Sequence, residues 1–547
     1  MKEPLPIELT SEEMDALLKR VETGSLAAGD YKIIAGIVET LKILSQAVEE
    51  KGISIQRLRQ MIFGFKTETS KNVLPEPVSG KPEPSPSTPN NSKAGAGNSE
   101  DAPNKPEGRN KAPGHGRNGA AKYTGAVWIK VAHPCLKAGD HCPKCARGKV
   151  YHLKDPERGT VVRITGLPPI QGRVYDLEQL RCNLCGEVLS PELPAGAGPD
   201  KYDAEACAVI ALLKYGCGFP FYRLERLQES LGVPLPSSTQ WELTENTADM
   251  VLPAYLELTR QAAQGEIIHN DDTTVKILDL IAENKATDES SRKGMFTSGL
   301  ISILGDIKIG LFVTGRNHAG ENMSALLAHR SKELQPPIQM CDALSRNLPT
   351  DIKTMLANCL THGRRQFVDI IENFPQACRF VIKILAKVYH NDSEAKKQNL
   401  SPEQRLSFHQ QESRPQMEEL HTWMNRQFEE KLVEPNSGLG KAIKYMLKHW
   451  EALTLFLRVA GAPLDNNICE RALKMAILHR KNSLFYKNEY GAYIGDIFMS
   501  LIHTCRLSKI NPFNYLTALQ KYADHLRQNP HLWLPWNYQT TLATLPP

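Results

Sequence analysis

Hydrophobic positions along this chain change their period several times, and each change marks a different kind of element. Within residues 9–70 they recur at helical spacing, first from Met14 to Val21 and again from Ile33 to Leu44. An amphipathic arm of this kind packs on a neighbour, and the pattern leaves core packing and a partner contact such as a coiled-coil dimer equally open. We therefore expect a helical N-terminal arm over residues 1–71.

The segment that follows, residues 72–122, has the composition of a disordered linker. Large apolar residues are missing between Val78 and Tyr123, where Pro, Ser, Asn, Gly and Lys dominate. From Ala102 to Lys149 ten Lys and Arg residues stand against two acidic ones, an excess that is larger than the net charge of +5 of the whole chain. A solvated tail and an arm that follows the DNA backbone are both compatible with this charge.

From residue 266 the hydrophobic period becomes that of strands. The predicted order is three strands in a meander, one helix, a fourth strand and a second helix, at Glu266–Leu278, Met295–Leu304, Lys308–Thr314, Gly320–Leu334, Ile338–Asp342 and Met355–Ile371. Gly305 and Asp306 suit a two-residue hairpin turn. This is the order of the ribonuclease H fold, in which the first and fourth strands lie side by side.

Helical patterns flank this predicted core. Residues 203–262 read as helices over Ala204–Tyr215 and Tyr222–Leu231 and a third that begins near Ser237, which fits either a helix-turn-helix or simple helical packing. The Ser and Thr residues before Glu242 are expected to cap the third helix. The remaining units are the core, residues 263–371; a charged helical insertion, residues 372–452, with a capping box at Ser401 and Gln404; a core helix, residues 453–500; and a C-terminal segment, residues 501–547.

Composition narrows the class of protein. A chain of 547 residues with 41% hydrophobic and 23% charged residues has material for about three to five units and is not collagen-like, a membrane bundle or wholly disordered. No apolar run approaches the roughly 18–20 residues that cross a bilayer, and the first ten residues lack the apolar centre of a signal peptide. A cytosolic location keeps thiols reduced, so clustered cysteines are expected to be metal ligands rather than disulfides.

Four of the 12 cysteines form two Cys-x-x-Cys pairs within residues 123–192, at Cys142 and Cys145 and at Cys182 and Cys185. Two intervening residues let one turn present both thiolates to a tetrahedral ion. Short strands at Val161–Thr165 and Arg173–Leu180 would complete a zinc ribbon with one structural Zn²⁺. A redox pair is the alternative, but it needs one Cys-x-x-Cys motif and not two.

Two carboxylates, Asp271 and Asp342, lie within predicted apolar strands. Burial of a charge is costly unless a partner neutralises it, and a divalent cation does so well. Hard oxygen ligands select Mg²⁺, and two such ions about 3.5–4 Å apart can activate water or a 3′-hydroxyl and stabilise the leaving oxygen at a phosphodiester. Glu470 is the third candidate, in the second turn of a helix that Asp465 is expected to cap, with a surface pair to Lys474 as the alternative.

Several motifs, in order along nearly the whole chain, resemble those of the large-subunit transposase of the IS66 family. They are Asp271-Asp272-Thr273; Asp342; the run Cys359–Phe367, with His362, Arg364 and Arg365; and the run Asp465–Phe485, with Glu470, Arg480 and Lys481. Met61–Glu68 is similar to the family's N-terminal LFG-K-SE signature, the cysteine pairs to its zinc-binding domain, and Leu532–Asn537 to its LLPW ending.

The resemblance implies a multidomain α+β DDE transposase, with the helical arm, the zinc ribbon and a ribonuclease H-like core that carries a helical insertion. Asp271, Asp342 and Glu470 would bind two catalytic Mg²⁺ ions for nicking at the element's ends and for attack of the freed 3′-hydroxyl on target DNA. Phosphate contacts would come from four basic residues, Arg364, Arg365, Arg480 and Lys481, whose alternative role is ordinary surface charge. His362 would orient a carboxylate or DNA, or satisfy a core hydrogen bond.

The partners implied by the family are DNA, both as terminal inverted repeats and as target, further copies of this chain, and accessory proteins of the same element. No membrane partner is expected, and the location would be the bacterial cytoplasm, at the nucleoid.

The chain departs from the family pattern beside two of the acids. The family usually has Asp-Glu-Thr-Pro at the first acid and Asp-Gly-Tyr at the second, where this chain has Asp271-Asp272-Thr273-Thr274 and Asp342-Ala343-Leu344. Because the acids are retained, an enzyme is favoured over an inactive DNA-binding derivative that uses only the zinc ribbon and basic arm. A stand-alone ribonuclease H-like nuclease would share the chemistry but would not need the arm and linker.

Overall fold

The computed structural model describes residues 200–286, 292–350 and 352–545, with short stretches between residues 19 and 34 and between residues 134 and 194. Contacts divide the chain into residues 78–173 and a larger unit made of residues 1–77 and 174–547. Most of the predicted arm and the predicted linker lie outside the described residues, as does the predicted strand Val161–Thr165. Within the described ranges, no helix combines the length and apolar character needed to cross a bilayer.

A five-stranded mixed sheet lies at the centre of the larger unit. Its strands are β3 (Ile267–Thr274), β4 (Phe296–Leu304), β5 (Ile307–Gly315), β6 (Ile338–Cys341) and β7 (Met355–Asn358), in the order β5-β4-β3-β6-β7. The first three are antiparallel, and β6 and β7 run parallel to β3. The first and fourth strands of the predicted order are therefore neighbours, as expected. The predicted hairpin turn is confirmed, with Gly305 at φ +56°.

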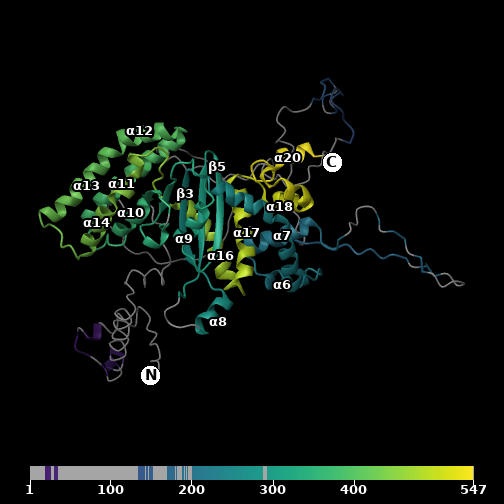
Figure 1. The fold of residues 1–547 in the computed structure, drawn as a ribbon, viewed down its shortest axis with the longest axis horizontal. Helices are drawn as coiled ribbons and strands as arrows, with labels where there is room; N and C mark the ends of the chain where they lie inside the picture. Colours follow the sequence, from purple (N-terminus) through teal and green to yellow (C-terminus); the bar gives the residue numbers. More distant parts are fainter. Residues whose placement is uncertain are drawn as a thin grey trace, which may run out of the picture. The chain divides into compact units, whose positions relative to one another are not determined.

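Helices cover both faces of the sheet, which explains why β4 is buried along most of its length (Figure 1). Helix α16 (Asn467–Ser483) packs on the face of β4 to which Gly299 belongs. On the opposite face, Asn322 of α9 (Ala319–Leu327) donates a hydrogen bond to Ser298 Oγ. Helix α7 (Ser237–Ala262) ends beside this same face, where Ser302 donates to the carbonyl of Ala262.

The outer edge of the sheet is closed by α17 (Glu489–Leu507). Alternate backbone N–H groups of β5 donate to side chains spaced four residues apart on the helix: Gly310 to Thr504 Oγ1, Phe312 to Ser500 Oγ and Thr314 to Asp496 Oδ2, at 3.0, 2.9 and 2.7 Å. An edge strand whose donors are satisfied in this way cannot pair with another chain.

A separate helical lobe lies beside the β7 end of the sheet (Figure 1). It consists of α10 (Leu360–Val368), α11 (Pro375–Lys397), α12 (Pro402–Glu412), α13 (Arg414–Glu429), α14 (Gly438–Lys448) and α15 (Trp450–Leu453), and its apolar side chains share a core with Ile338, Met340 and Ala357 of the sheet. The predicted capping box is confirmed, since Ser401 accepts from the N–H of Gln404 and Gln404 accepts from the N–H of Ser401. The insertion is helical, as the sequence indicated.

The helices before and after the core pack together on its other side. They are α5 (Ala204–Ala211), α6 (Phe221–Ser230) and α7 at one end of the chain, and α18 (Pro512–Lys521), α19 (Ala523–Gln528) and α20 (Tyr538–Thr544) at the other. Trp533 is fully buried there, and Tyr515 donates to its carbonyl at 2.7 Å. The C-terminal segment is thus part of the main hydrophobic core.

Several predicted boundaries were wrong. Residues 355–358 form strand β7 rather than the start of a helix, and Leu278 begins helix α8 (Leu278–Ala286) rather than ending a strand. Residues 173–178 are not a strand, because pairing begins only at β1 (Leu180–Arg181) with β2 (Val188–Leu189). No Ser or Thr side chain caps α7, which follows Pro236, and Ser237 donates instead to Glu225.

Candidate active site

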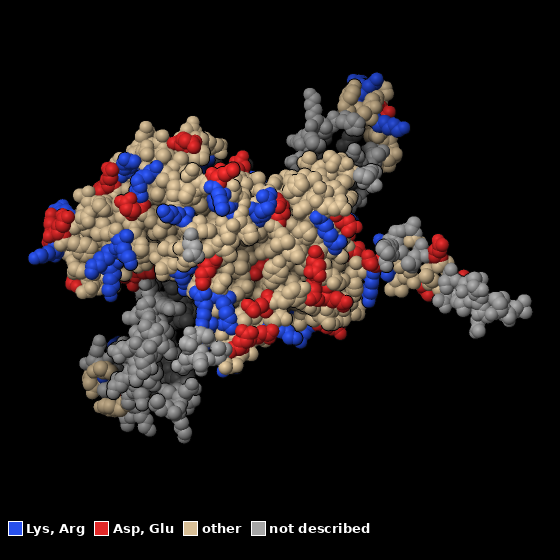
Figure 2. Space-filling model, in the orientation of Figure 1, with Lys and Arg blue, Asp and Glu red and all other residues tan. Residues whose placement is uncertain are grey.

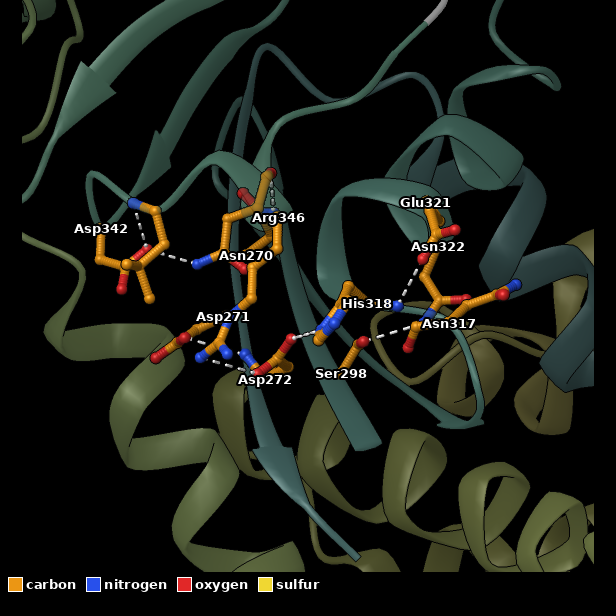
Figure 3. Close-up of polar contacts among 12 residues, drawn as sticks. Asn270, Asp271, Asp272, Ser298, Asn317, His318, Glu321, Asn322, Asp342 and Arg346 are labelled. Carbon is orange, nitrogen blue, oxygen red and sulfur yellow. Dashed lines mark hydrogen bonds and ion pairs between the residues drawn. The ribbon is translucent and has the colours of Figure 1, made fainter. Parts of the chain in front are cut away.

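Asp271 lies within β3, and Asp342 directly follows the last residue of the neighbouring parallel strand β6. The register pairs His269 of β3 with Met340 of β6, and each aspartate follows two residues later in its own strand direction. Because side chains two residues apart point to the same face, the two carboxylates project from the same side of the sheet (Figure 3). The sequence predicted this convergence from the strand order alone.

The environment of Asp271 disfavours its charged form. Burial raises the pKa of Asp271 to about 7, and the nearby charges of Asp342, Asp272 and Glu470 act in the same direction. The backbone N–H of Asp272 donates to Asp271 Oδ1 at 2.8 Å and opposes the shift. The carboxylates of Asp342 and Glu470 are thus close enough to Asp271 to repel its charge. A bound cation would replace this repulsion with attraction.

Asp342 is held by the loop that follows β6. Its Oδ1 accepts from the backbone N–H of Leu344 at 3.1 Å and from the side-chain amide of Asn347. The carbonyl of Asn347 in turn accepts from the side chains of Asn270 and Gln339, at 2.7 Å each. This buried amide network joins β3, β6 and the loop, and it holds Oδ1 of the Asp342 carboxylate in a fixed orientation.

Glu470 comes from the first turn of α16, and the residue that positions this helix is Asn466 rather than Asp465. The predicted cap was therefore wrong. Asp465 Oδ1 accepts from the N–H of Asn467 at 3.1 Å, whereas Asn466 occupies the N-cap position. The fully buried Asn466 side chain donates to the carbonyl of Asn270 at 3.1 Å and accepts from His269 Nδ1 at 3.1 Å. Burial lowers the pKa of His269 to about 4, so its ring is neutral.

A glycine lets α16 approach the sheet beside Asp271. Gly299 is the cross-strand partner of Asp271, and a Cβ atom built there would lie 3.1 Å from Leu473 Cδ2 and 3.4 Å from Cys469 Sγ. Cys469 also donates to the carbonyl of Gly299 at 3.2 Å. Cys469 and Leu473, which flank Glu470 in the sequence of the helix, therefore both lie close to the backbone of β4 at Gly299.

A second polar cluster, which the sequence did not reveal, surrounds Asp272 (Figure 3). Its side chain is 2% exposed, and His318 Nδ1 lies 2.8 Å from Oδ2 while Arg346 NH2 lies 3.6 Å from Oδ1. His318 also packs against the ring of Phe296, with the two ring centroids 4.0 Å apart. A second aspartate directly after Asp271 was the available signal, but its partners lie far along the chain.

The four basic residues assigned to phosphate contacts occupy different environments. Lys481 is exposed, and Arg365 and Arg480 are half-buried, but Arg364 is only 8% exposed. Arg480 donates to Thr273 Oγ1 at 3.1 Å and to Thr274 Oγ1 at 2.8 Å, which ties α16 to the end of β3 just beyond the acids. Arg480 and Lys481 thus lie in the last turn of α16, at the opposite end of the helix from Glu470.

His362, in the first turn of α10, lies beside the third acid. Its Nε2 is 3.9 Å from Glu470 Oε1. The alternative in which Glu470 pairs with Lys474 does not describe this neighbourhood, because Glu470 faces His362 and the carboxylates of the sheet.

The predicted zinc ligands can be located only in part. Cys145 is exposed, while Cys142, Cys182 and Cys185 lie outside the described residues. On the face drawn in Figure 2, basic and acidic side chains are interspersed over the described surface. The most basic stretch of the sequence, residues 102–149, is itself largely outside the described ranges.

Comparison with known proteins gives one family match and three relatives. The family model described as "Transposase IS66 family" matches residues 201–494, which include all three acids. "Uncharacterized protein y4hP" of Sinorhizobium fredii is 27% identical over 431 residues, 74% of each chain. "Uncharacterized protein y4jD" of the same organism is 35% identical over 34% of this chain and 36% of its own, and "Uncharacterized protein y4qI" is 25% identical over 61% and 62%.

Proposed function

This chain belongs to the IS66 family of transposases, and from that premise we propose that it is a DDE transposase that cleaves the DNA ends of its element and joins them to target DNA. The observation that carries the proposal is the proximity of Asp271 in β3, Asp342 directly after β6 and Glu470 in α16. The strand order β5-β4-β3-β6-β7, with three antiparallel strands followed by two parallel ones, supports a ribonuclease H-like core.

The three carboxylates fit divalent ions. Glu470 Oε1 is buried and, among the described residues, accepts no hydrogen bond, and burial with neighbouring negative charge raises the pKa of Asp271. A buried acceptor without a donor and a cluster of negative charges are both unfavourable. A divalent cation that is shared by the carboxylate oxygens would relieve both. Two Mg²⁺ ions bound by Asp271, Asp342 and Glu470 would activate the attacking water or 3′-hydroxyl and stabilise the leaving oxygen.

The remaining residues would position these groups and the DNA. Asn347 and Leu344 orient Asp342, Asn466 places the start of α16, and Arg480 holds the end of β3. Lys481 and Arg365 are accessible for phosphate contacts, whereas the buried Arg364 would act through the packing of α10. Asp272 would hold His318 and Arg346 beside the acids, and either of these could face a bound DNA strand.

DNA recognition would involve parts of the chain beyond the acids. We assign a structural Zn²⁺ to Cys142, Cys145, Cys182 and Cys185, and DNA contacts to the basic arm and to the helices α5, α6 and α7. Joining two element ends requires more than one catalytic site, so the active form would be an oligomer, assisted by accessory proteins of the same element, at the nucleoid of a bacterial cell.

The experiment is a strand-transfer assay with the full chain, labelled element-end duplex, Mg²⁺ and supercoiled target plasmid. Strand-transfer products that are lost in Asp271→Ala and Asp342→Ala, with end binding retained in both, would support the transposase. End binding without cleavage in the wild type and in both variants would instead identify the inactive DNA-binding derivative. Cleavage without joining would identify a nuclease.

A further inference from the structure

The first turns of two helices meet at Glu470 and bring together three potential metal ligands. Cys359 is the N-cap residue of α10, His362 lies in its first turn, and Glu470 lies in the first turn of α16. One ligand atom from each of these three residues lies within 4.8 Å of the other two. The cluster adjoins the carboxylates of the sheet, since the Glu470 charge acts on Asp271.

His362 and Glu470 leave polar atoms unsatisfied. In the described part of the chain, His362 Nδ1 and Glu470 Oε1 are both buried without a hydrogen-bond partner. The distance of 3.9 Å from His362 Nε2 to Glu470 Oε1 is too long for a hydrogen bond. Two neighbouring ligand atoms that each lie about 2.0–2.2 Å from one metal ion are about 3.0–3.5 Å apart, so a small inward shift of either side chain would let both atoms bind a common ion.

Cys359 plays a different part in this cluster. Its Sγ is fully buried and accepts from the backbone N–H of Asn466 at 3.3 Å. It therefore fixes the start of α16 against α10 and sets the spacing between His362 and Glu470.

We propose that His362 supplies a nitrogen ligand to the divalent ion bound by Glu470, so that the two ion positions of the site are chemically different. The proposal rests on the proposed function in that it takes Glu470 as a metal ligand. The position between Asp271 and Asp342 offers oxygen ligands, as Mg²⁺ prefers, whereas an imidazole beside Glu470 shifts preference toward Mn²⁺ and other transition ions.

The test is pulsed electron paramagnetic resonance of the zinc-replete full chain loaded with Mn²⁺, which detects a nitrogen bound directly to the ion. We expect nitrogen modulation in the wild type and in the control His329→Gln, which changes an exposed histidine, and its loss in His362→Gln. Calorimetry should show Mn²⁺ affinity at least about 10-fold weaker in His362→Gln than in the control.

Absence of nitrogen modulation in the wild-type protein would overturn the proposal, whatever the folding of the variants, and would leave a water between His362 and Glu470 as the occupant. Modulation that persists in His362→Gln would overturn it as well. Failure of the proposed function is distinguishable: nitrogen modulation that depends on His362 without any DNA cleavage would retain this site and reject the transposase.

Discussion

The side-chain amide of Asn466 donates a hydrogen bond to the backbone carbonyl of Asn270, 3.1 Å away and 196 residues earlier in the chain. Asn270 directly precedes Asp271, and Asn466 directly precedes the helix that carries Glu470. One buried side chain therefore links the strand of the first acid to the helix of the third. The same side chain accepts from His269, so its amide orientation is fixed at both ends.

Replacement of Asn466 should uncouple the third acid from the other two. Asn466→Ala leaves the carbonyl of Asn270 and the ring of His269 without a partner, at a cost of about 1–3 kcal/mol for each buried group. We expect DNA cleavage about 10–100-fold slower at a temperature where the variant remains folded. Asn467→Ala, at the neighbouring half-buried position, is the matched control and should cleave at the wild-type rate. Equal rates for the two variants would reject this role of Asn466.

A methyl group added at Gly299 of β4 should displace α16 from its position against the sheet. Its Cβ would lie 3.1 Å from the side chain of Leu473, which must give way by a few tenths of an ångström, and we expect α16 and Glu470 to shift with it. Because small misplacement of catalytic groups is costly, we expect Gly299→Ala to slow cleavage about 10-fold with DNA affinity unchanged. Gly315→Ala is the matched control, since a Cβ at this position of β5 meets no atom within 4 Å. A Gly299→Ala protein as active as this control would contradict the close packing of α16.

The two aspartates could be predicted from the sequence because their signal is local. A charged residue inside a short apolar run is visible without any knowledge of the fold, and the strand order then places Asp271 beside Asp342. The role of Asn466 could not be predicted. Asp465, Asn466 and Asn467 are three consecutive residues that all suit an N-cap, and the partners that select Asn466 lie in β3.

Two further features, strand β7 and the contact of His318 with Asp272, could not be predicted for the same physical reason. Strand β7 has four residues, too few to distinguish a strand period from a helical one, and its pairing with β6 decides its conformation. His318 reaches Asp272 across 46 residues, so neither residue carries a local signal of the pair. Contacts of this kind are fixed by tertiary structure and not by neighbours in the chain.

Asp496 should make stability depend on pH. Burial raises its pKa to about 7 although Thr314 donates to both carboxylate oxygens. Between about pH 4 and pH 7 the folded state therefore holds a proton on Asp496 that the unfolded state has released. The contribution of this proton to the free energy of unfolding is fully present below about pH 4 and is lost as the pH rises through about 7. The change amounts to up to about 4 kcal/mol.

Asp496→Asn removes this titration, so urea unfolding at pH 5 and pH 8 should show a smaller pH-dependent loss of unfolding free energy in the variant than in the wild type. Other titrating groups contribute equally to both proteins. The interpretation is wrong if the loss between the two pH values is the same in the two proteins.

The paired cysteines should bind one structural zinc ion. Four thiolates at Cys142, Cys145, Cys182 and Cys185 would hold about one Zn²⁺ per chain, measured by plasma emission on folded protein. Cys142→Ser should lower this content and destabilise the region around it, whereas Cys217→Ser, at an exposed cysteine outside the pairs, should leave it unchanged. Folded wild-type protein without zinc would refute the ribbon.

The most direct test of the central claim is the rate of Mg²⁺-dependent cleavage of element-end DNA by Glu470→Gln. The amide keeps the size of the side chain but removes the charge that would bind the ion, and α16 stays anchored by Asn466. We predict a rate at least about 100-fold below that of the wild type, with end-DNA affinity unchanged. Cleavage within twofold of the wild-type rate would contradict a catalytic site built from Asp271, Asp342 and Glu470.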